Sequence, residues 1–288
     1  MRKQLLWICG GGHLGELSLK ALARNPRWQI TSVWTDRRSH GIIQWAKGSR
    51  IPLHIGKPKK ILSKGQTLKA DVLLSLNYLF LLPQSVLASV PIAINIHGAL
   101  LPKYRGRTPN TWAIINDEVE TGITVHEMTK EVDAGDILYQ EKIPISNTDT
   151  GWSLIERLSR RYPIILNKVL MDIAKGKVVR QPQNGQKQSY CGKREPSDGL
   201  VDWRWSARKV YNWVRAQTKP YPGAFFFHQR KKYMLWRVEE CYDPKFFLKK
   251  KAGSPFFIGK DMFIRCGRGA VKIIDFEIIE GRHVDTKA

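Results

Sequence analysis

The sequence predicts an α/β protein built on a Rossmann-like, mostly parallel, doubly wound sheet, followed by a small C-terminal OB-like β domain. Three observations lead to this expectation. Strand-like and helix-like segments alternate up to about residue 175, as in sheets whose parallel strands are joined by helices. A glycine-rich turn, Gly10-x-Gly12-x-x-Gly15, joins the first strand to the first helix. After residue 200, short aromatic and β-branched runs alternate with turns, which is typical of antiparallel sheets.

Apolar runs place the strands of the large domain. We expect buried strands over residues 4–9, 28–34, 51–55, 71–76, 91–96, 122–126 and 137–145. A helix should cover residues 13–24 and a helical turn residues 84–88. Residues 110–116 should form another helix, with Pro109 at its start, where a missing N–H is tolerated.

A longer helix is expected to follow Thr150. Its apolar residues repeat at the 3–4 spacing of a single helix face: Trp152, Ile155, Leu158 and Tyr162. Pro163 is expected to end this helix, because proline removes a backbone N–H, and a second helix should run to about Ala174.

Residues 176–199 lose this periodicity and are rich in Gln, Lys, Gly and Pro, so we expect a linker there. Residues 206–218 fit one amphipathic helix, with Val210, Trp213 and Val214 on one side. Short strands should follow over residues 224–228, 233–238, 256–257, 263–266 and 271–279. The expected domains are therefore residues 1–175, the linker 176–199, and a β domain with a leading helix over 200–288.

The formal net charge of +23 favours anionic partners: nucleic acid, nucleotide-linked substrates, polyglutamylated folate or an acidic membrane surface. Cationic clusters lie at residues 57–60, 230–232 and 249–251, and each can equally be a solvated surface tract. Charge alone does not choose among these partners.

The four cysteines lie far apart in the sequence and form no C-x-x-C pair, so neither a zinc site nor a disulfide framework is indicated. A reduced, cytoplasmic protein fits this usage. The apolar residues 72–96 are long enough for a membrane span, but Asn77, Pro83, Gln84 and Pro91 divide them into strand, loop, short helix and strand. We therefore expect no membrane span.

The glycine-rich turn has two interpretations. With Asp36 just beyond the second strand, it nearly reproduces the dinucleotide-binding fingerprint, which would make an NAD(P)-binding enzyme. Arg37 and Arg38 blur that pattern. The alternative is a tight strand-to-helix turn that binds no nicotinamide, and we favour it because the three-glycine pattern alone is weakly specific.

The stretch from residue 94 to 109 carries the strongest chemical signal. Asn95 and His97 are two residues apart on a strand, so their side chains share one face at a strand end, where open α/β sheets bind ligands. Asp133 lies in a loop between two later strands. An amide, an imidazole and a carboxylate form a plausible acyl-transfer set: an oxyanion donor, a base and a group that orients the base.

The motif N-x-H-G-x-L-L-P-K-Y-R-G, followed by the aspartate of V-D-A-G-D-I, resembles the formyltransferase family that uses 10-formyltetrahydrofolate. The resemblance runs from about residue 70 to 225. It implies transfer of a formyl group from N10 of the folate to a primary amine, with no metal. Asn95 would stabilise the oxyanion, and Asp133 would fix the His97 tautomer or relay a proton through water. His97 would be the base, or as imidazolium would help the oxyanion.

The resemblance also implies where the folate lies, mostly against main chain at the strand ends. The candidate folate-binding residues follow one strand and surround the catalytic acid: Ser75, Leu76, Asn77, Val132 and Asp136. Plain strand packing for residues 75–77 and loop capping by Asp136 remain the alternatives.

Three acceptors are open: a nucleotide-linked amino sugar, methionine on initiator tRNA, and a small purine precursor. Residues 103–109, 193–203 and 220–225 resemble sugar N-formyltransferases most, and the long basic insertion usual in methionyl-tRNA formyltransferases is missing from residues 35–50. We therefore favour the nucleotide sugar. The candidate acceptor-binding residues are Lys103, Arg105, Arg107, Lys193, Arg194 and Tyr221, with Trp203 as a second ring for stacking.

A non-enzymatic alternative is an RNA-binding module on an inactive scaffold, since the chain is basic and an OB-like tail is expected. The complete Asn95, His97 and Asp133 set argues against it. The sequence does not specify the oligomeric state, and a homodimer stays open.

Overall fold

The computed structural model describes residues 3–58, 69–247 and 249–279. They divide into two compact units. The first unit comprises Met1–Gly106, Thr121–Ile143 and Ile155–Cys191, and the second comprises Arg107–Glu120, Pro144–Leu154 and Gly192–Ala288.

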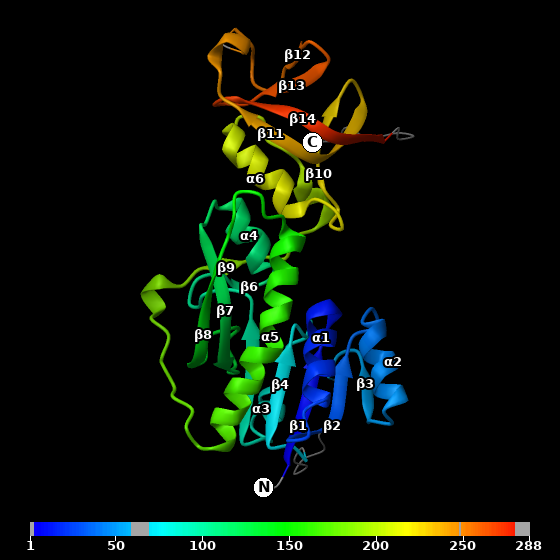
Figure 1. The fold of residues 1–288 in the computed structure, drawn as a ribbon, viewed down its shortest axis with the longest axis vertical. Helices are drawn as coiled ribbons and strands as arrows, with labels where there is room; N and C mark the ends of the chain where they lie inside the picture. Colours follow the sequence, from blue (N-terminus) through cyan, green and yellow to red (C-terminus); the bar gives the residue numbers. More distant parts are fainter. Residues whose placement is uncertain (1–2, 59–68, 248, 280–288) are drawn as a thin grey trace. The chain divides into compact units, whose positions relative to one another are not determined.

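The first unit is built on a sheet whose strand order, among the described residues, is β3-β2-β1-β4-β5-β7-β8 (Figure 1). Strands β1 to β5 pair in parallel, and β7 pairs with β5 in the antiparallel direction. The mostly parallel sheet expected from the sequence is confirmed. The strands are β1 (Gln4–Gly10), β2 (Trp28–Thr35), β3 (Leu53–Ile55), β4 (Val72–Leu76), β5 (Ile92–His97), β7 (Glu120–Glu127) and β8 (Ile137–Pro144).

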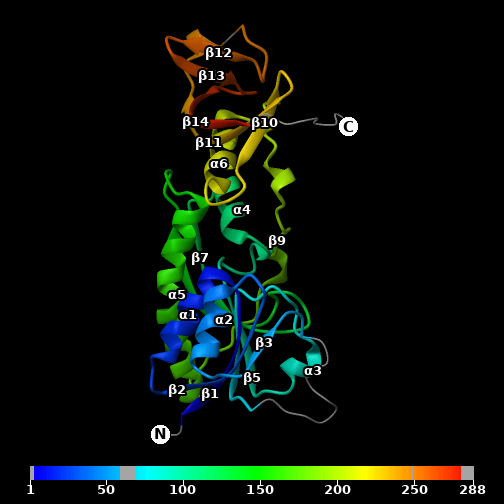
Figure 2. The same ribbon diagram turned by 90° about the vertical axis from the view of Figure 1, so that its right-hand side faces the viewer.

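Helices cover both faces of this sheet: α1 (Gly12–Ala23) and α5 (Gly151–Ala174) lie on one side and α3 (Gln84–Leu87) on the other (Figure 2). Val86 and Leu87 of α3 pack with Cys9, Leu73 and Ala93, which belong to three adjacent strands. The doubly wound arrangement follows from this two-sided burial, because the strands are apolar on both faces.

Helix α2 (His40–Gly48) was not anticipated from the sequence. Ile42 and Ala46, four residues apart, are fully buried, and they anchor a helix too short to give a clear periodic signal. Residues 35–50, from which a long basic insertion was judged to be missing, thus contain an ordinary crossover helix between β2 and β3.

The expectation that Pro163 ends a helix is wrong, because α5 continues through it to Ala174. A proline inside a helix costs about 3 kcal/mol. Leu158, Tyr162 and Leu166 are nearly fully buried on one face, and burial of such side chains offsets that cost. The Asn167 side chain also donates a hydrogen bond to the Pro163 carbonyl (2.9 Å).

Part of the expected linker belongs to the first unit. Gln181 bridges Ile137, and β9 (Tyr190–Cys191) pairs in parallel with β6 (Arg105–Gly106). We call residues 181–191 the 181–191 segment. Short 3₁₀ turns occur at η1 (Gly185–Lys187), η2 (Pro196–Gly199) and η3 (Pro244–Phe246).

The second unit combines helices α4 (Pro109–Ile115) and α6 (Ala207–Gln217) with an antiparallel sheet. The Ser206 hydroxyl caps α6 by accepting the Lys209 N–H (3.2 Å). The expected small β domain is confirmed. Among the described residues its strand order is β10 (Ala224–His228), β11 (Lys231–Cys241), β14 (Ala270–Ile279), β13 (Asp261–Arg265) and β12 (Pro255–Ile258).

Candidate functional site

Two adjacent strands of the first unit place four polar side chains on one face of the sheet. Asn95 and His97 are on β5, and in the antiparallel ladder they face His126 and Thr124 of β7. Directly opposed residues share a face, as do residues two apart on one strand. The spacing read from the sequence therefore places Asn95 and His97 together, and β7 contributes a second pair.

Asp133 lies at the centre of this group. Its Oδ2 accepts the Gly106 N–H (2.8 Å) and lies 3.5 Å from His97 Nδ1. Its Oδ1 lies 3.3 Å from both His126 Nε2 and Asn95 Nδ2. The backbone at Asp133 is left-handed (φ 53°), a conformation that aspartate tolerates better than most residues. The structure thus brings together the three residues predicted to be catalytic.

The hydrogen bond made by His97 fixes its tautomer. Nε2 lies 2.8 Å from the Tyr104 carbonyl, which can only accept, so Nε2 carries the proton. In the neutral ring, Nδ1 then has its lone pair on the side of Asp133. Burial lowers the pKa of His97, against the opposing effect of the Asp133 charge. The imidazole is therefore neutral near pH 7 and can accept a proton.

Asp133 is ionised throughout the useful pH range. Burial alone would raise the pKa of its carboxyl. At the low pH where this carboxyl titrates, His126 and His97 are protonated. The hydrogen bond from protonated His126, the charges of both rings and the Gly106 N–H then outweigh burial and lower the pKa of Asp133 to about 2. A fixed negative charge beside His97 stabilises the imidazolium that proton transfer would create.

His126 is a site residue that the sequence analysis missed. Its Nδ1 lies 2.7 Å from the Glu127 carbonyl, so Nδ1 carries the proton and Nε2 can accept the Asn95 amide (3.1 Å). Both Asn95 N–H groups then have acceptors, His126 and Asp133. Donation to a substrate oxygen requires that one of these contacts be given up. The signal was present: Thr124-x-His126 repeats the spacing of Asn95-x-His97 on the next strand.

The residues predicted to bind folate occupy two places. Ser75 pairs with Asn95 in the β4–β5 ladder and shares its face. The Leu76 carbonyl accepts the Gly11 N–H (3.0 Å), and Asn77 donates its side-chain amide to the Gly11 carbonyl (3.2 Å). These two residues therefore brace the glycine-rich turn. Val132 is exposed beside Asp133, and the Asp136 carbonyl accepts the Glu127 N–H (2.9 Å).

The glycine-rich turn is bound by side chains from the segment between β2 and α2. The Gly12 N–H is bound by Ser39 Oγ (2.9 Å), and Ser39 donates to Asp36 Oδ2 (2.7 Å). The other Asp36 oxygen accepts the Arg38 N–H (2.8 Å), and Asp36 is only 6% exposed. The acidic residue of the fingerprint is thus engaged within the protein, which favours the interpretation of a structural turn.

Two of the predicted acceptor-binding cations lie in the first unit. Lys103 is exposed, whereas the Arg105 guanidinium is buried. Arg105 donates to Gln183 Oε1 from Nε (3.1 Å) and from Nη2 (2.6 Å). It also donates to Gln188 Oε1 (2.9 Å) and to the Tyr190 hydroxyl (3.2 Å). Arg105 therefore joins the stretch that follows β5 to the 181–191 segment.

The other candidates lie in the second unit. Arg107 and Lys193 are exposed, and Lys193 forms an ion pair with Glu195. Arg194 lies between two indole rings, 5.2 Å from the centroid of Trp112 and 4.3 Å from that of Trp213. Burial raises the pKa of the Tyr221 phenol to about 12.

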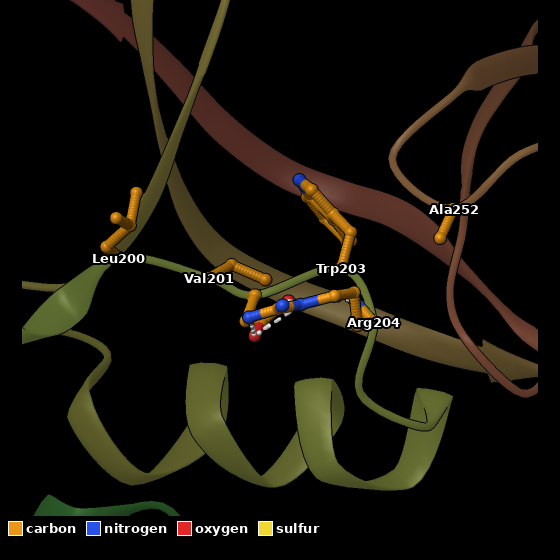
Figure 3. Close-up of a pocket in the computed structure, with 6 residues that line it drawn as sticks. Leu200, Val201, Trp203, Arg204 and Ala252 are labelled. Carbon is orange, nitrogen blue, oxygen red and sulfur yellow. Dashed lines mark hydrogen bonds and ion pairs between the residues drawn. The ribbon is translucent and has the colours of Figure 1, made fainter. Parts of the chain in front are cut away.

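Trp203, the second ring proposed for stacking, borders a surface cavity of about 440 Å³ in the second unit. Figure 3 shows Leu200 and Ala252 on either side of the indole. The ring meets Phe226 edge to face, with centroids 5.2 Å apart. The lining residues are Leu200, Val201, Asp202, Trp203, Arg204 and Ala252.

Among the residues that the structure describes, no group of three or more His, Cys, Asp or Glu side chains could hold a metal ion. Within those same residues, no helix combines the length and the apolar character needed to cross a membrane.

A Rossmann-like sheet with an amide, an imidazole and a carboxylate at its strand ends, joined to an antiparallel β unit, defines an enzyme of the group-transfer class. Residues 32–170 match the formyl transferase family, and residues 193–288 match the formyl transferase C-terminal domain. The chain belongs to the formyl transferase family.

Named relatives support this assignment. The chain is 37% identical over 214 residues to the bifunctional polymyxin resistance protein ArnA of Wigglesworthia glossinidia brevipalpis, covering 74% of this chain but only 32% of ArnA. It thus spans about a third of that relative's length.

Two solved structures share the fold at low sequence identity. One is the N-formyltransferase from Helicobacter canadensis in complex with folinic acid and dTDP-3-aminofucose (TM-score 0.73, 18% identity, 96% of this chain and 100% of that chain). The other is the methionyl-tRNA formyltransferase from Clostridium thermocellum (TM-score 0.59, 18% identity, 96% of this chain and 100% of that chain).

Proposed function

We propose that this protein transfers a formyl group from 10-formyltetrahydrofolate to the primary amine of a nucleotide-linked amino sugar. The observation that carries the proposal is the convergence of Asn95, a buried neutral His97 and an ionised Asp133 at the end of β5. Formyl transfer to an amine needs an oxyanion donor, a proton acceptor and a group that stabilises the protonated acceptor.

In the proposed reaction, the amine nitrogen attacks the formyl carbon and the carbonyl oxygen becomes an oxyanion. Asn95 leaves one of its two contacts and donates to this oxygen. His97 accepts the proton released by the amine, and Asp133 stabilises the imidazolium. The oxyanion then re-forms the carbonyl, the bond from the formyl carbon to N10 breaks, and N10 takes the proton from the His97 imidazolium, which restores the neutral base. The products are a formamide and tetrahydrofolate, and the chemistry needs neither a metal nor a nicotinamide.

The nucleotide sugar is favoured over other amines by two comparisons. About three quarters of this chain (74%), but only 32% of ArnA, takes part in the match to ArnA. The chain also shares its fold with an N-formyltransferase solved with a dTDP-linked amino sugar. The charge of +23 suits a diphosphate. A free amino sugar lacks the remote groups that contribute binding energy, so it should show a lower kcat/KM.

The test is a panel of dTDP- and UDP-linked 3-amino and 4-amino sugars with 10-formyltetrahydrofolate, following tetrahydrofolate release and the mass of the formamide. Free amino sugars form the control arm. The second candidate, methionyl-tRNA formylation, has the fold shared with the Clostridium thermocellum enzyme in its favour. Charged initiator tRNA is therefore assayed alongside at matched salt, because RNA affinity depends on salt. Rapid tRNA formylation with every sugar nucleotide inert would overturn the proposal.

A further inference from the structure

Gln183 makes four hydrogen bonds from one amide. Its Nε2 donates to the carbonyls of Asp133 (2.9 Å) and Gly135 (2.7 Å). Its Oε1 accepts both Nε and Nη2 of Arg105 (3.1 and 2.6 Å). Carbonyls only accept and a guanidinium only donates, so the orientation of this amide is fixed by its partners. Residues 181–190 are all described by the structure, and among them only Gln183 is partly buried; the other nine are exposed.

One side of this bridge holds the backbone of the catalytic acid. Asp133 is in the left-handed region, where a non-glycine residue is disfavoured by about 1–2 kcal/mol. Gln183 binds the carbonyls of Asp133 and Gly135, so it restrains the main chain of the loop. The Asp133 carboxylate meanwhile faces His97. The loop cannot rotate to a relaxed conformation without breaking these two hydrogen bonds.

The other side of the bridge leads to the base. Arg105 directly follows Tyr104, whose carbonyl accepts the His97 Nε2 proton. Ser189 binds both residues, accepting the Arg105 N–H at its carbonyl (2.8 Å) and the Tyr104 N–H at its hydroxyl (2.8 Å). The 181–191 segment thus holds both the carbonyl that sets the His97 tautomer and the loop that carries Asp133.

We propose that Gln183 is a positioning residue of the formyl-transfer site, which holds the Asp133 carboxylate in register with His97 by joining the Asp133 loop to Arg105. The expected effect on kcat rests on the proposed function. The positioning of Asp133 by Gln183 rests only on the hydrogen bonds described above. A misplacement of about 1 Å at a reacting centre can cost about 10²-fold in rate, so the loss of this bridge is measurable although Gln183 does not touch the reacting atoms.

Gln183→Glu is the informative variant. One carboxylate oxygen of the glutamate still accepts from Arg105 and forms an ion pair with it. The other oxygen replaces the donating NH₂ and faces the carbonyls of Asp133 and Gly135, to which it cannot donate. We expect kcat to fall by about 10- to 100-fold, within the range for a displaced catalytic group. The KM values for both substrates should change by less than about threefold, because the change acts on orientation rather than on uniform binding. Gln183→Met, which lacks both polar groups, should show a similar loss and serves if the glutamate variant does not fold.

Gln188→Glu is the matched control. Gln188 makes the same type of contact with Arg105 from the same segment. Among the residues that the structure describes, only Gln183 of these two glutamines hydrogen-bonds the Asp133 loop. The same chemical change there should leave kcat within about twofold of wild type.

A second readout separates positioning from general destabilisation. The groups that face His97 are Asp133 and His126, and the negative charge of Asp133 raises the pKa of His97. If Asp133 moves away in Gln183→Glu, nitrogen NMR of the ring should show a lower His97 pKa than in wild type. Gln188→Glu should leave it unchanged.

The outcomes are distinct. A reduced kcat with a lowered His97 pKa in Gln183→Glu, and neither in Gln188→Glu, supports the proposal. Unchanged kcat and pKa in the folded Gln183 variants, or equal losses in both glutamate variants, overturns it. If wild type formylates no acceptor, the proposed function fails on its own, and the NMR comparison still decides whether Gln183 holds Asp133 against His97.

Discussion

Asn95 and His126 face each other across the β5–β7 ladder, with Asn95 Nδ2 3.1 Å from His126 Nε2. The amide proposed to bind the oxyanion therefore begins in contact with a second histidine. His126 is in turn oriented by the Glu127 carbonyl (2.7 Å), so the Asn95 side chain is held by a relay of fixed hydrogen bonds.

Replacing His126 tests this relay. His126→Leu removes the acceptor for Asn95 and the partner of Asp133, so we expect kcat to fall by about tenfold or more, as when a catalytic group loses its orientation. The pKa of Asp133 should rise from about 2, because protonated His126, which donates from Nε2 to Asp133 at low pH, is the partner that most lowers it. Carbon NMR of the carboxyl measures that shift. An Asp133 pKa that stays near 2 would contradict the assigned contact.

The three central residues should act as a unit. His97→Ala should lower kcat by about 10²–10⁴, the range for a lost general base. Asn95→Ala should lower it by about 10²–10³, as for a lost oxyanion donor, and Asp133→Asn should also be severe. The double variants should lose less than the sum of the single losses. His40→Ala, at an exposed histidine on α2, is the matched control and should leave kcat unchanged. Near-wild-type turnover in all three folded variants would place the chemistry elsewhere.

The pH dependence should follow His97. A base works when neutral, and burial lowers its pKa, so kcat/KM should rise with pH and level off with a midpoint below the ordinary value of 6.5. Asp133, with a pKa of about 2, stays ionised across that range and adds no second inflection. Asp133→Asn removes the charge that raises the His97 pKa, so the residual activity should titrate at still lower pH. A midpoint of the kcat/KM profile that moves to higher pH in this variant would contradict the assignment of His97 as the base.

The glycine-rich turn should prove structural. A Cβ at Gly15 would lie 2.7 Å from the Leu76 carbonyl and one at Gly11 2.5 Å from the Asn77 carbonyl. Gly15→Ala should therefore lower stability by about 1–3 kcal/mol, as overpacking does. Thermal unfolding measures this loss. Gly48→Ala, where a Cβ would meet open space, is the control.

The same turn separates folate binding from nicotinamide binding. Calorimetry with NAD, NADP and a formyl-folate analogue should detect only the folate analogue, because the Asp36 carboxylate is engaged by Ser39 and the Arg38 N–H. Tight NAD binding without folate binding would refute the acyl-transfer interpretation.

Of two neighbouring cations, Arg194 should contribute to stability and Lys193 to binding of the acceptor. Arg194 lies between the rings of Trp112 and Trp213 and donates to Gln217 Oε1 (3.1 Å), so Arg194→Leu should lower the melting temperature. Lys193 is exposed with an ion pair to Glu195, and Lys193→Ala should raise the acceptor KM several-fold with little change in stability. An unchanged KM in the Lys193 variant would remove it from the acceptor site.

Much of the fold was accessible from the sequence because its signals are local. The strand–helix alternation, the Pro109 helix start and the amphipathic α6 each depend on residues a few positions apart. The effect of Pro163 was predicted wrongly because burial of one face of α5 outweighs the local cost of a proline within a helix. Helix α2 was missed because its two buried residues are too few to reveal a helical repeat.

For the site, sequence patterns could relate only residues that lie on the same strand. Asn95 and His97 were found from their spacing, but His126 and Gln183 matter through partners 31 and 50 residues away, Asn95 and Asp133. Arg105, expected to meet substrate, is drawn into the protein by the glutamines and the tyrosine of the 181–191 segment, which no local pattern reveals.

The left-handed backbone at Asp133 restricts how this enzyme can diverge. Asparagine, aspartate and glycine are the residues that enter this conformation at least cost. Neither asparagine nor glycine carries a charge, and glutamate keeps the charge but fits the backbone poorly. A carboxylate can therefore be retained here almost only as aspartate. We expect fewer substitutions to preserve activity at position 133 than at Asn95 or His97. Variants with asparagine or glycine at position 133 should fold but be inactive.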